Sequence, residues 1–193
     1  MTSLDYIRTG TAEDAVSSLE LAAEFFEQAK LDERYWKWFI VALHAGIQGT
    51  FVLALEGSDG LLVQKPGVMK ATLSADRTGN VPPQQYMDNL LKLYKKLQRP
   101  EYLRSVNSQP IAASQKHECA LSSLDSLRNE FLHFNAKSLS IERELVIVRA
   151  RESLEVAMFL LAESRSILWR EHSHEERAKA AITRLCCALH QES

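Results

Sequence analysis

The sequence predicts an all-α protein, an up-and-down bundle of four main helices with shorter helices added. No segment alternates apolar and polar residues for more than a few positions, which argues against strands. All five prolines lie between residues 66 and 110, so both ends of the chain are free to be helical. The 193 residues suffice for one domain with a real core and are short for two. We therefore expect a single helical domain over residues 1–193.

Local signals mark the first two helices. Thr11–Asp14 has the form of a capping box and should open a helix that runs to about Ala29. A second helix is expected over roughly Asp32–Glu56. Within it, Trp38–Leu55 is 18 residues without a charge, the lower limit for a membrane span. Charged flanks and internal polar residues favour the central helix of a bundle instead, with His44 as a hydrogen-bonded core histidine.

The middle of the chain is rich in turn signals. Residues 57–82 contain Gly-Ser-Asp-Gly, Lys-Pro-Gly and Thr-Gly-Asn, and should form a long irregular connection. Such a connection in a compact domain is functional or mobile, and the residues do not choose between gating a substrate and binding a partner. A short helix should begin at Pro83, since proline suits the first helical position. A second irregular stretch covers about Arg99–Ser114.

The last part of the chain predicts three helices. One should run from about Gln115 to Phe134. Ser140 is a suitable N-cap for the longest helix, which has acids in its first turn and should reach about Arg170. Residues 172–177 open a final helix to about His190. The His-x-His pair at its start argues against a metal site, because the two rings lie about 200° apart on a helix.

Charge and cysteine usage exclude some classes of protein. The net charge is −2, so no overall imbalance indicates a nucleic-acid or membrane partner. Residues 64–106 carry eight Lys and Arg against three acids, a basic segment that is most often a solvated surface. Cys119, Cys186 and Cys187 lack metal-site spacing, and we interpret them as reduced thiols of a cytoplasmic protein. The first residues have no apolar core, which argues against a signal peptide.

The segment Leu127–Asn135, LRNEFLHFN, places three polar groups in a helix that otherwise builds the core. Asn129 and His133 are four residues apart and stack on the face roughly opposite the apolar stripe. Arg128 lies on the flank, about 140° from His133. His133 should therefore point toward water or a second molecule. The stripe itself consists of Leu121, Leu124, Leu127, Phe131 and Phe134.

These three residue types suit phosphodiester chemistry without a metal or cofactor. Arginine supplies a fixed cation and a fork of donors for phosphate. Histidine takes or gives a proton near neutral pH. Asparagine orients either group or binds a phosphate oxygen. The alternative is an ordinary solvated helix face, on which Arg and His are common.

With its all-helical context, this segment resembles the HEPN superfamily, the higher eukaryotes and prokaryotes nucleotide-binding domain. The signature of that family is an arginine, often a polar residue next, and a histidine after four to six intervening residues. Arg128, Asn129 and His133 match it with four intervening residues. A short link and a long helix follow, as in the family. Outside residues 115–165 the likeness is only in helix order.

The resemblance implies a metal-independent endoribonuclease that works as a homodimer, with the motifs of two chains forming one composite site. His133 would be general base or acid, Arg128 would stabilise charge on the phosphate, and Asn129 would hold the phosphate or orient the histidine. The products would be a 2′,3′-cyclic phosphate and a 5′-hydroxyl. RNA phosphates would be gripped by basic residues if the fold brings them close: Lys92, Lys95, Lys96 and Arg99.

A role as toxin or defence effector, with an antitoxin or regulatory protein as partner, also follows from the resemblance. One branch of the family carries, two residues after the histidine, a tyrosine that its antitoxin modifies. Asn135 stands there in this chain, which argues against that control mechanism and leaves ribonuclease activity open.

Two other functions remain open at this stage. The chain is alternatively a non-catalytic HEPN-like module that binds a nucleotide, RNA or a protein, or a purely structural bundle. The aromatic segment Tyr35–Phe39 offers rings on which bases can stack. Such a segment is more often one buried helix face with an exposed neighbour.

Overall fold

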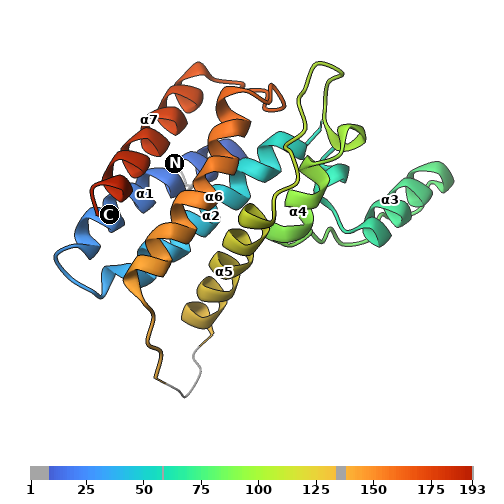
Figure 1. Cartoon of the computed structure of the whole chain (residues 1–193). Helices are drawn as coiled ribbons and strands as arrows, with labels where there is room; N and C mark the ends of the chain where they lie inside the picture. Colours follow the sequence, from blue (N-terminus) through green and yellow to red (C-terminus); the bar gives the residue numbers. More distant parts are fainter. Residues whose placement is uncertain (1–8, 58, 134–137, 193) are drawn as a thin grey trace, which may run out of the picture.

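The computed structural model describes residues 9–57, 59–133 and 138–192, and it confirms the all-α bundle (Figure 1). Five long helices of 18 to 21 residues build it, where the sequence indicated four. They are α1 (Thr11–Ala29), α2 (Tyr35–Leu55), α5 (Gln115–Leu132), α6 (Arg143–Ala162) and α7 (His172–His190). The shorter elements are α3 (Pro66–Thr78), α4 (Leu90–Leu97), and the 3-10 turns η1 (Leu61–Val63) and η2 (Pro100–Tyr102).

Helix α2 is the centre of the bundle and packs against α1, α4, α5 and α6. Its length and composition match a membrane span, yet 67% of the apolar window is buried inside the protein. The packing therefore accounts for its hydrophobicity. Gly46 and Gly49 let α1 approach closely, because a Cβ there would lie 2.7 Å from the Leu19 side chain and 2.6 Å from Ala15 Cβ, respectively.

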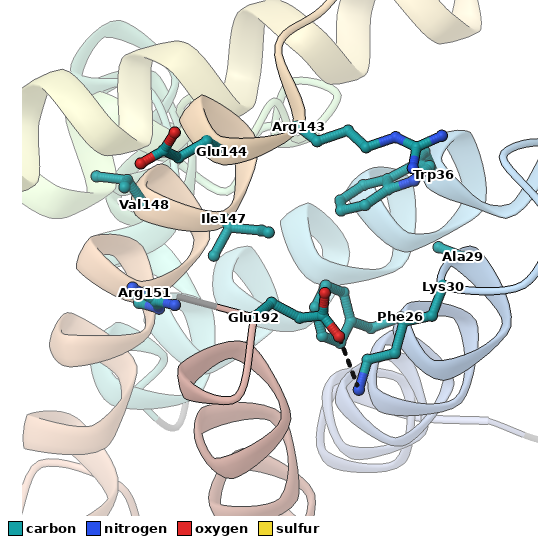
Figure 2. A pocket seen from close by; sticks show the side chains of 10 residues that line it. All are labelled: Phe26, Ala29, Lys30, Trp36, Arg143, Glu144, Ile147, Val148, Arg151 and Glu192. Atoms are coloured by element: carbon teal, nitrogen blue, oxygen red, sulfur yellow. Dashed lines mark ion pairs between the residues drawn. The ribbon is translucent and has the colours of Figure 1, made fainter.

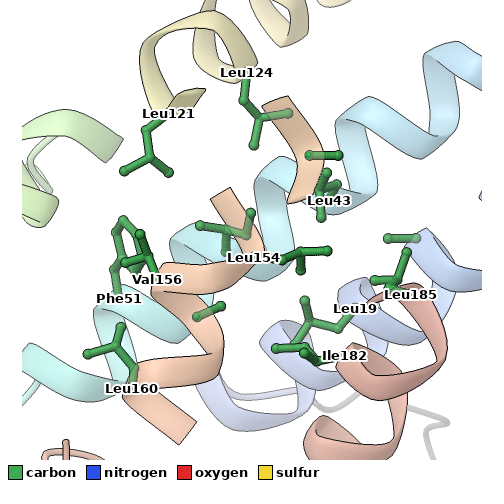
Figure 3. Close-up of a cluster of buried hydrophobic side chains, with 14 of the residues drawn as sticks. Leu19, Leu43, Phe51, Leu121, Leu124, Leu154, Val156, Leu160, Ile182 and Leu185 are labelled. Atoms are coloured by element: carbon green, nitrogen blue, oxygen red, sulfur yellow. The ribbon is translucent and has the colours of Figure 1, made fainter. Parts of the chain in front are cut away.

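One hydrophobic core joins the five long helices (Figure 3). Each contributes leucines that are fully or almost fully buried, among them Leu19, Leu43, Leu121, Leu154 and Leu185. The core fixes where each helix stands and leaves the outer face of α5 exposed.

Helix α1 begins at Thr11 as expected, but the predicted capping box is wrong. Gly10 is the N-cap residue, and no side chain caps the helix. The Thr9 hydroxyl donates to the Asp14 carboxylate instead. The hydroxyl that contacts Asp14 thus belongs to Thr9, two residues before the Thr11 of the predicted capping box.

The segment 57–82 is not irregular throughout, since it contains α3. Pro66 occupies the first turn, and Gly79 ends the helix with φ 69°. The helix projects from the bundle, and Ala75 is its one buried side chain (Figure 1). The turn predicted at Thr-Gly-Asn coincides with the end of the helix at Gly79, but Lys-Pro-Gly is not a turn, because Pro66 and Gly67 begin α3.

Two further boundaries differ because distant segments hold the backbone. Helix α4 starts at Leu90 rather than Pro83, since residues before it pair with residues 63–65, as in the bond from Asp88 N to Val63 O at 2.9 Å. Helix α6 ends at Ala162 rather than near Arg170. There Gln109 N donates to Ser164 O at 2.8 Å and ties the chain to the loop before α5. Helix α6 also begins after Glu142, not after Ser140.

Candidate functional site

Helix α5 lies antiparallel to α2, and side-chain contacts fix the register. Near the middle of both helices, His44 Nε2 lies 2.8 Å from Asp125 Oδ1. Toward the other end, the Tyr94 ring is 6.4 Å from Phe51 and 6.5 Å from His117. Phe51 follows His44 on α2, whereas His117 precedes Asp125 on α5, so the helices run in opposite directions (Figure 1).

The His44–Asp125 pair is buried on one side only. His44 is 2% exposed, which confirms the expected core histidine, and 27% of the Asp125 side chain is exposed. Burial lowers the pKa of His44 most, and the nearby Arg128 lowers it further against the opposing effect of Asp125. The lowered pKa favours a neutral imidazole that donates to the Asp125 carboxylate near pH 7. This pair anchors α5 one turn before Arg128.

The apolar stripe of α5 faces the core as predicted. Leu121 and Leu124 are buried, and Leu127 and Phe131 pack half-buried against the same core. The fifth member of the stripe, Phe134, lies outside the described residues. The core contact is therefore firm in the first half of α5 and looser toward its end.

His133 ends the helix and faces solvent. It is the C-cap residue of α5, and its backbone N–H donates to Asn129 O at 2.9 Å. Its side chain is exposed, as expected. Within residues 9–57, 59–133 and 138–192, no hydrogen bond or ion pair holds the imidazole. Both ring nitrogens are thus available to a ligand or a second chain.

Arg128 and Asn129 form a pair beside it. Arg128 Nη1 donates to Asn129 Oδ1 at 2.6 Å, and both side chains are half-buried. No carboxylate of the described residues forms an ion pair with Arg128. Its positive charge is therefore not neutralised within the described chain. The wheel separates Arg128 and His133 by about 140°, so they do not converge on one atom within a single chain.

The predicted basic residues lie elsewhere. Lys95 Nζ pairs with Glu118 Oε1 at 2.9 Å, in the first turn of α5. That is ten residues before Arg128, or about 15 Å along the helix. The fold thus places α4 beside the opposite end of α5. Lys92, Lys95 and Arg99 line one shallow pocket there.

Lys96 requires a correction, since it is not a surface cation. The residue is 8% exposed, and its Nζ lies 2.7 Å from Asp88 Oδ2. The ammonium also donates to the carbonyls of Leu62 and Gln64 at 2.8 and 2.7 Å. Lys96 ties α4 to the segment after η1, and contact with RNA phosphates is not expected of it.

A pocket of about 570 Å³ opens where α6 begins and α1 ends (Figure 2). Its floor is aromatic, but its cations have partners. Lys30 lies 3.6 Å from Glu192, Arg143 lies 3.7 Å from Glu33, and Arg151 donates to a carbonyl of α7. The unneutralised Arg128 and the exposed His133 make α5 the stronger candidate site.

Comparison with known proteins gives no match to a family model, to a curated protein or to a solved structure. The residues of α5 and their surroundings are consequently the observations that bear on function.

Proposed function

We propose that the protein is a metal-independent endoribonuclease of HEPN type that acts as a homodimer in the cytoplasm. The observation that carries the proposal is a pair of groups at the end of α5. No carboxylate of the described residues neutralises Arg128, and the exposed His133 ring has no hydrogen bond or ion pair among those residues. Arginine and histidine also occur on ordinary solvated helix faces, and what favours a site here is their combination with Asn129 in the spacing that resembles the HEPN signature. A function as toxin or defence effector, held in check by an antitoxin or regulatory protein, is part of the same proposal.

The chemistry is a transesterification within the RNA strand. His133 takes the proton of the ribose 2′-hydroxyl, and the 2′-oxygen attacks the adjacent phosphorus. The bond from phosphorus to the 5′-oxygen breaks, and an imidazolium returns a proton to that leaving oxygen. Arg128 stabilises the added negative charge on the phosphate oxygens, with Asn129 fixing the guanidinium. The products are a 2′,3′-cyclic phosphate and a 5′-hydroxyl.

Two chains are needed in this account. Because Arg128 and His133 diverge on one helix, the arginine of one chain works with the histidine of its partner. Leu132, which is 44% exposed between them, supplies apolar surface for the contact. A twofold arrangement of two α5 helices would bring each Arg128 toward the other chain's His133.

The test is cleavage of a mixed RNA pool by the purified protein in EDTA, with end-group analysis of the products. His172→Ala is the matched control, since the His172 side chain is exposed on α7 and belongs to no part of the site. Cyclic phosphate ends from wild type and from His172→Ala, and none from His133→Ala, support the proposal. Cleavage that survives in His133→Ala, or cleavage of no RNA by wild type, contradicts it.

A second function, RNA binding without cleavage, is favoured by one observation. Arg128 is half-buried and held by Asn129, as in a binding or interface residue, rather than extended into solvent. The same preparation distinguishes the two, because a binding module binds RNA and yields no cyclic phosphate ends, whereas the nuclease yields them from wild type and not from His133→Ala.

A further inference from the structure

Trp38 differs from the other large aromatic residues of α2. Phe39 is fully buried, and Trp36 packs edge-on against Phe26 with ring centroids 5.8 Å apart. Trp38 is 47% exposed. The ammonium of Lys37 lies 5.0 Å from its ring centroid. An exposed indole with a cation beside it is well suited to a ligand with a flat ring and a negative charge.

The register places this pair at the level of His133. Trp38 is six residues before His44, and His133 is eight residues after Asp125. Because the helices are antiparallel, both residues lie toward the same end of the bundle, about 9 Å and about 12 Å from the His44–Asp125 contact. The neighbouring residues agree, since Ile40 of α2 and Phe131 of α5 line one pocket.

Trp38 and His133 also lie on the same side of the α2–α5 pair. Buried Leu43 and Leu124 each precede the contact residue by one position, so the core covers the same rotational side of both helices. Trp38 and His133 are rotated the other way, by about 120° and about 80° from the contact residues. In antiparallel helices, that side is one shared face turned to solvent, and both residues are exposed.

We propose that Trp38 is the base-stacking platform for the RNA strand that enters the α5 site, with Lys37 beside the adjoining phosphate. The inference rests on the proposed function and specifies its substrate, single-stranded RNA. A base has to leave its own stack to lie on the indole, which a duplex does not permit. A stacked base also holds the strand at a fixed distance from His133.

The experiment measures binding separately from cleavage. His133→Ala protein is titrated into a fluorescently labelled oligouridylate, and anisotropy gives the affinity. Adding Trp38→Ala should weaken binding about 5-fold to 100-fold, the range for the loss of one stacked base. Trp38→Phe should restore most of the affinity, because it keeps a ring. Tyr86→Ala is the matched control, an exposed aromatic (51%) outside this face, and should change nothing.

The outcomes separate this inference from the proposed function. The inference is overturned if the His133→Ala protein binds oligouridylate equally well with and without Trp38→Ala. It is also overturned if that protein binds no oligouridylate, or if it prefers duplex RNA to single strands. Wild type that binds through Trp38 yet cleaves no RNA overturns the nuclease and keeps the platform. If wild type cleaves RNA and the Trp38→Ala variant cleaves it with the same KM, the nuclease stands and the stacking platform is overturned.

Discussion

Two clusters of arginine and histidine, one on α7 and one on α5, differ in whether carboxylates pair with them. Arg177 donates four hydrogen bonds to the carboxylates of Glu13 and Glu20, at 2.7 to 3.0 Å. His174 lies 3.0 Å from Glu13 in the same cluster. On α5 the arginine has an asparagine as partner and the histidine has no hydrogen bond or ion pair among the described residues.

We interpret this difference as that between a structural cluster and the proposed site. The hydrogen bonds of Arg177 lower the pKa of Glu13 to about 2 and raise the pKa of the arginine. The charges of this cluster therefore neutralise one another within the chain. This cluster fastens α7 to α1. Among the described residues no acid forms an ion pair with Arg128, which is why we propose that its charge serves to bind a phosphate.

The largest expected effect concerns activity and contrasts the two histidines. His133→Ala should reduce RNA cleavage by about 10²-fold to 10⁴-fold, the contribution of a general acid or base, and leave the melting temperature unchanged. His174→Ala should leave the cleavage rate per folded molecule unchanged. Rates and melting curves measured on both proteins check this. Equal loss of cleavage in both variants would contradict the assignment of His133, and not His174, to the proposed site.

The next effect concerns the anchor below the site. Asp125→Ala leaves the buried His44 without its partner and should lower the free energy of unfolding by about 1–3 kcal/mol. Asp125→Asn keeps an oxygen that accepts from His44 and should cost less. Urea denaturation of the two variants gives the comparison. An Asp125→Ala protein as stable as wild type would show that the pair does not anchor α5.

A smaller effect is expected in the α7 cluster. Arg177→Met breaks both ion pairs, but the side chains of Arg177, Glu13 and Glu20 are 38 to 41% exposed. Solvent screening therefore limits the expected loss of stability to about 1 kcal/mol. Thermal unfolding at neutral pH is the measurement, and RNA cleavage should be unaffected. A loss of cleavage without a loss of stability would assign this cluster to the site.

The smallest effect is the pH dependence of the same cluster. The pKa of Glu13 is about 2 in the folded protein and 4.5 when unperturbed. Its contribution to stability is complete above pH 4.5 and is lost as the pH falls from 4.5 toward 2. Arg177→Met should flatten this part of the stability curve. Denaturant unfolding at several acidic pH values shows whether the variant and wild type converge there.

Local signals predicted some elements well and others poorly, for a physical reason. The bounds of α7 and the start of α1 agree with the prediction, although the capping box expected at Thr11 does not form. The start of α4 and the end of α6 depend on backbone hydrogen bonds to distant segments, such as the bond from Gln109 N to Ser164 O. A local sequence pattern therefore does not predict them.

The candidate site divides in the same way. The exposure of His133 follows from helical periodicity, which the sequence contains. The His44–Asp125 bond joins residues 81 positions apart, and only the packing of α2 against α5 reveals it. The internal role of Lys96 likewise depends on Asp88 and on carbonyls of an earlier turn.

The most direct test of the central claim mixes two inactive variants. Arg128→Ala and His133→Ala proteins, with different tags, are unfolded together and refolded, and the mixed dimers are purified through both tags. A mixed dimer holds one arginine and one histidine on different chains. We predict that the mixed dimer regains cleavage, which neither parent dimer has. Mixed dimers that form and stay inactive would contradict a site shared between two chains.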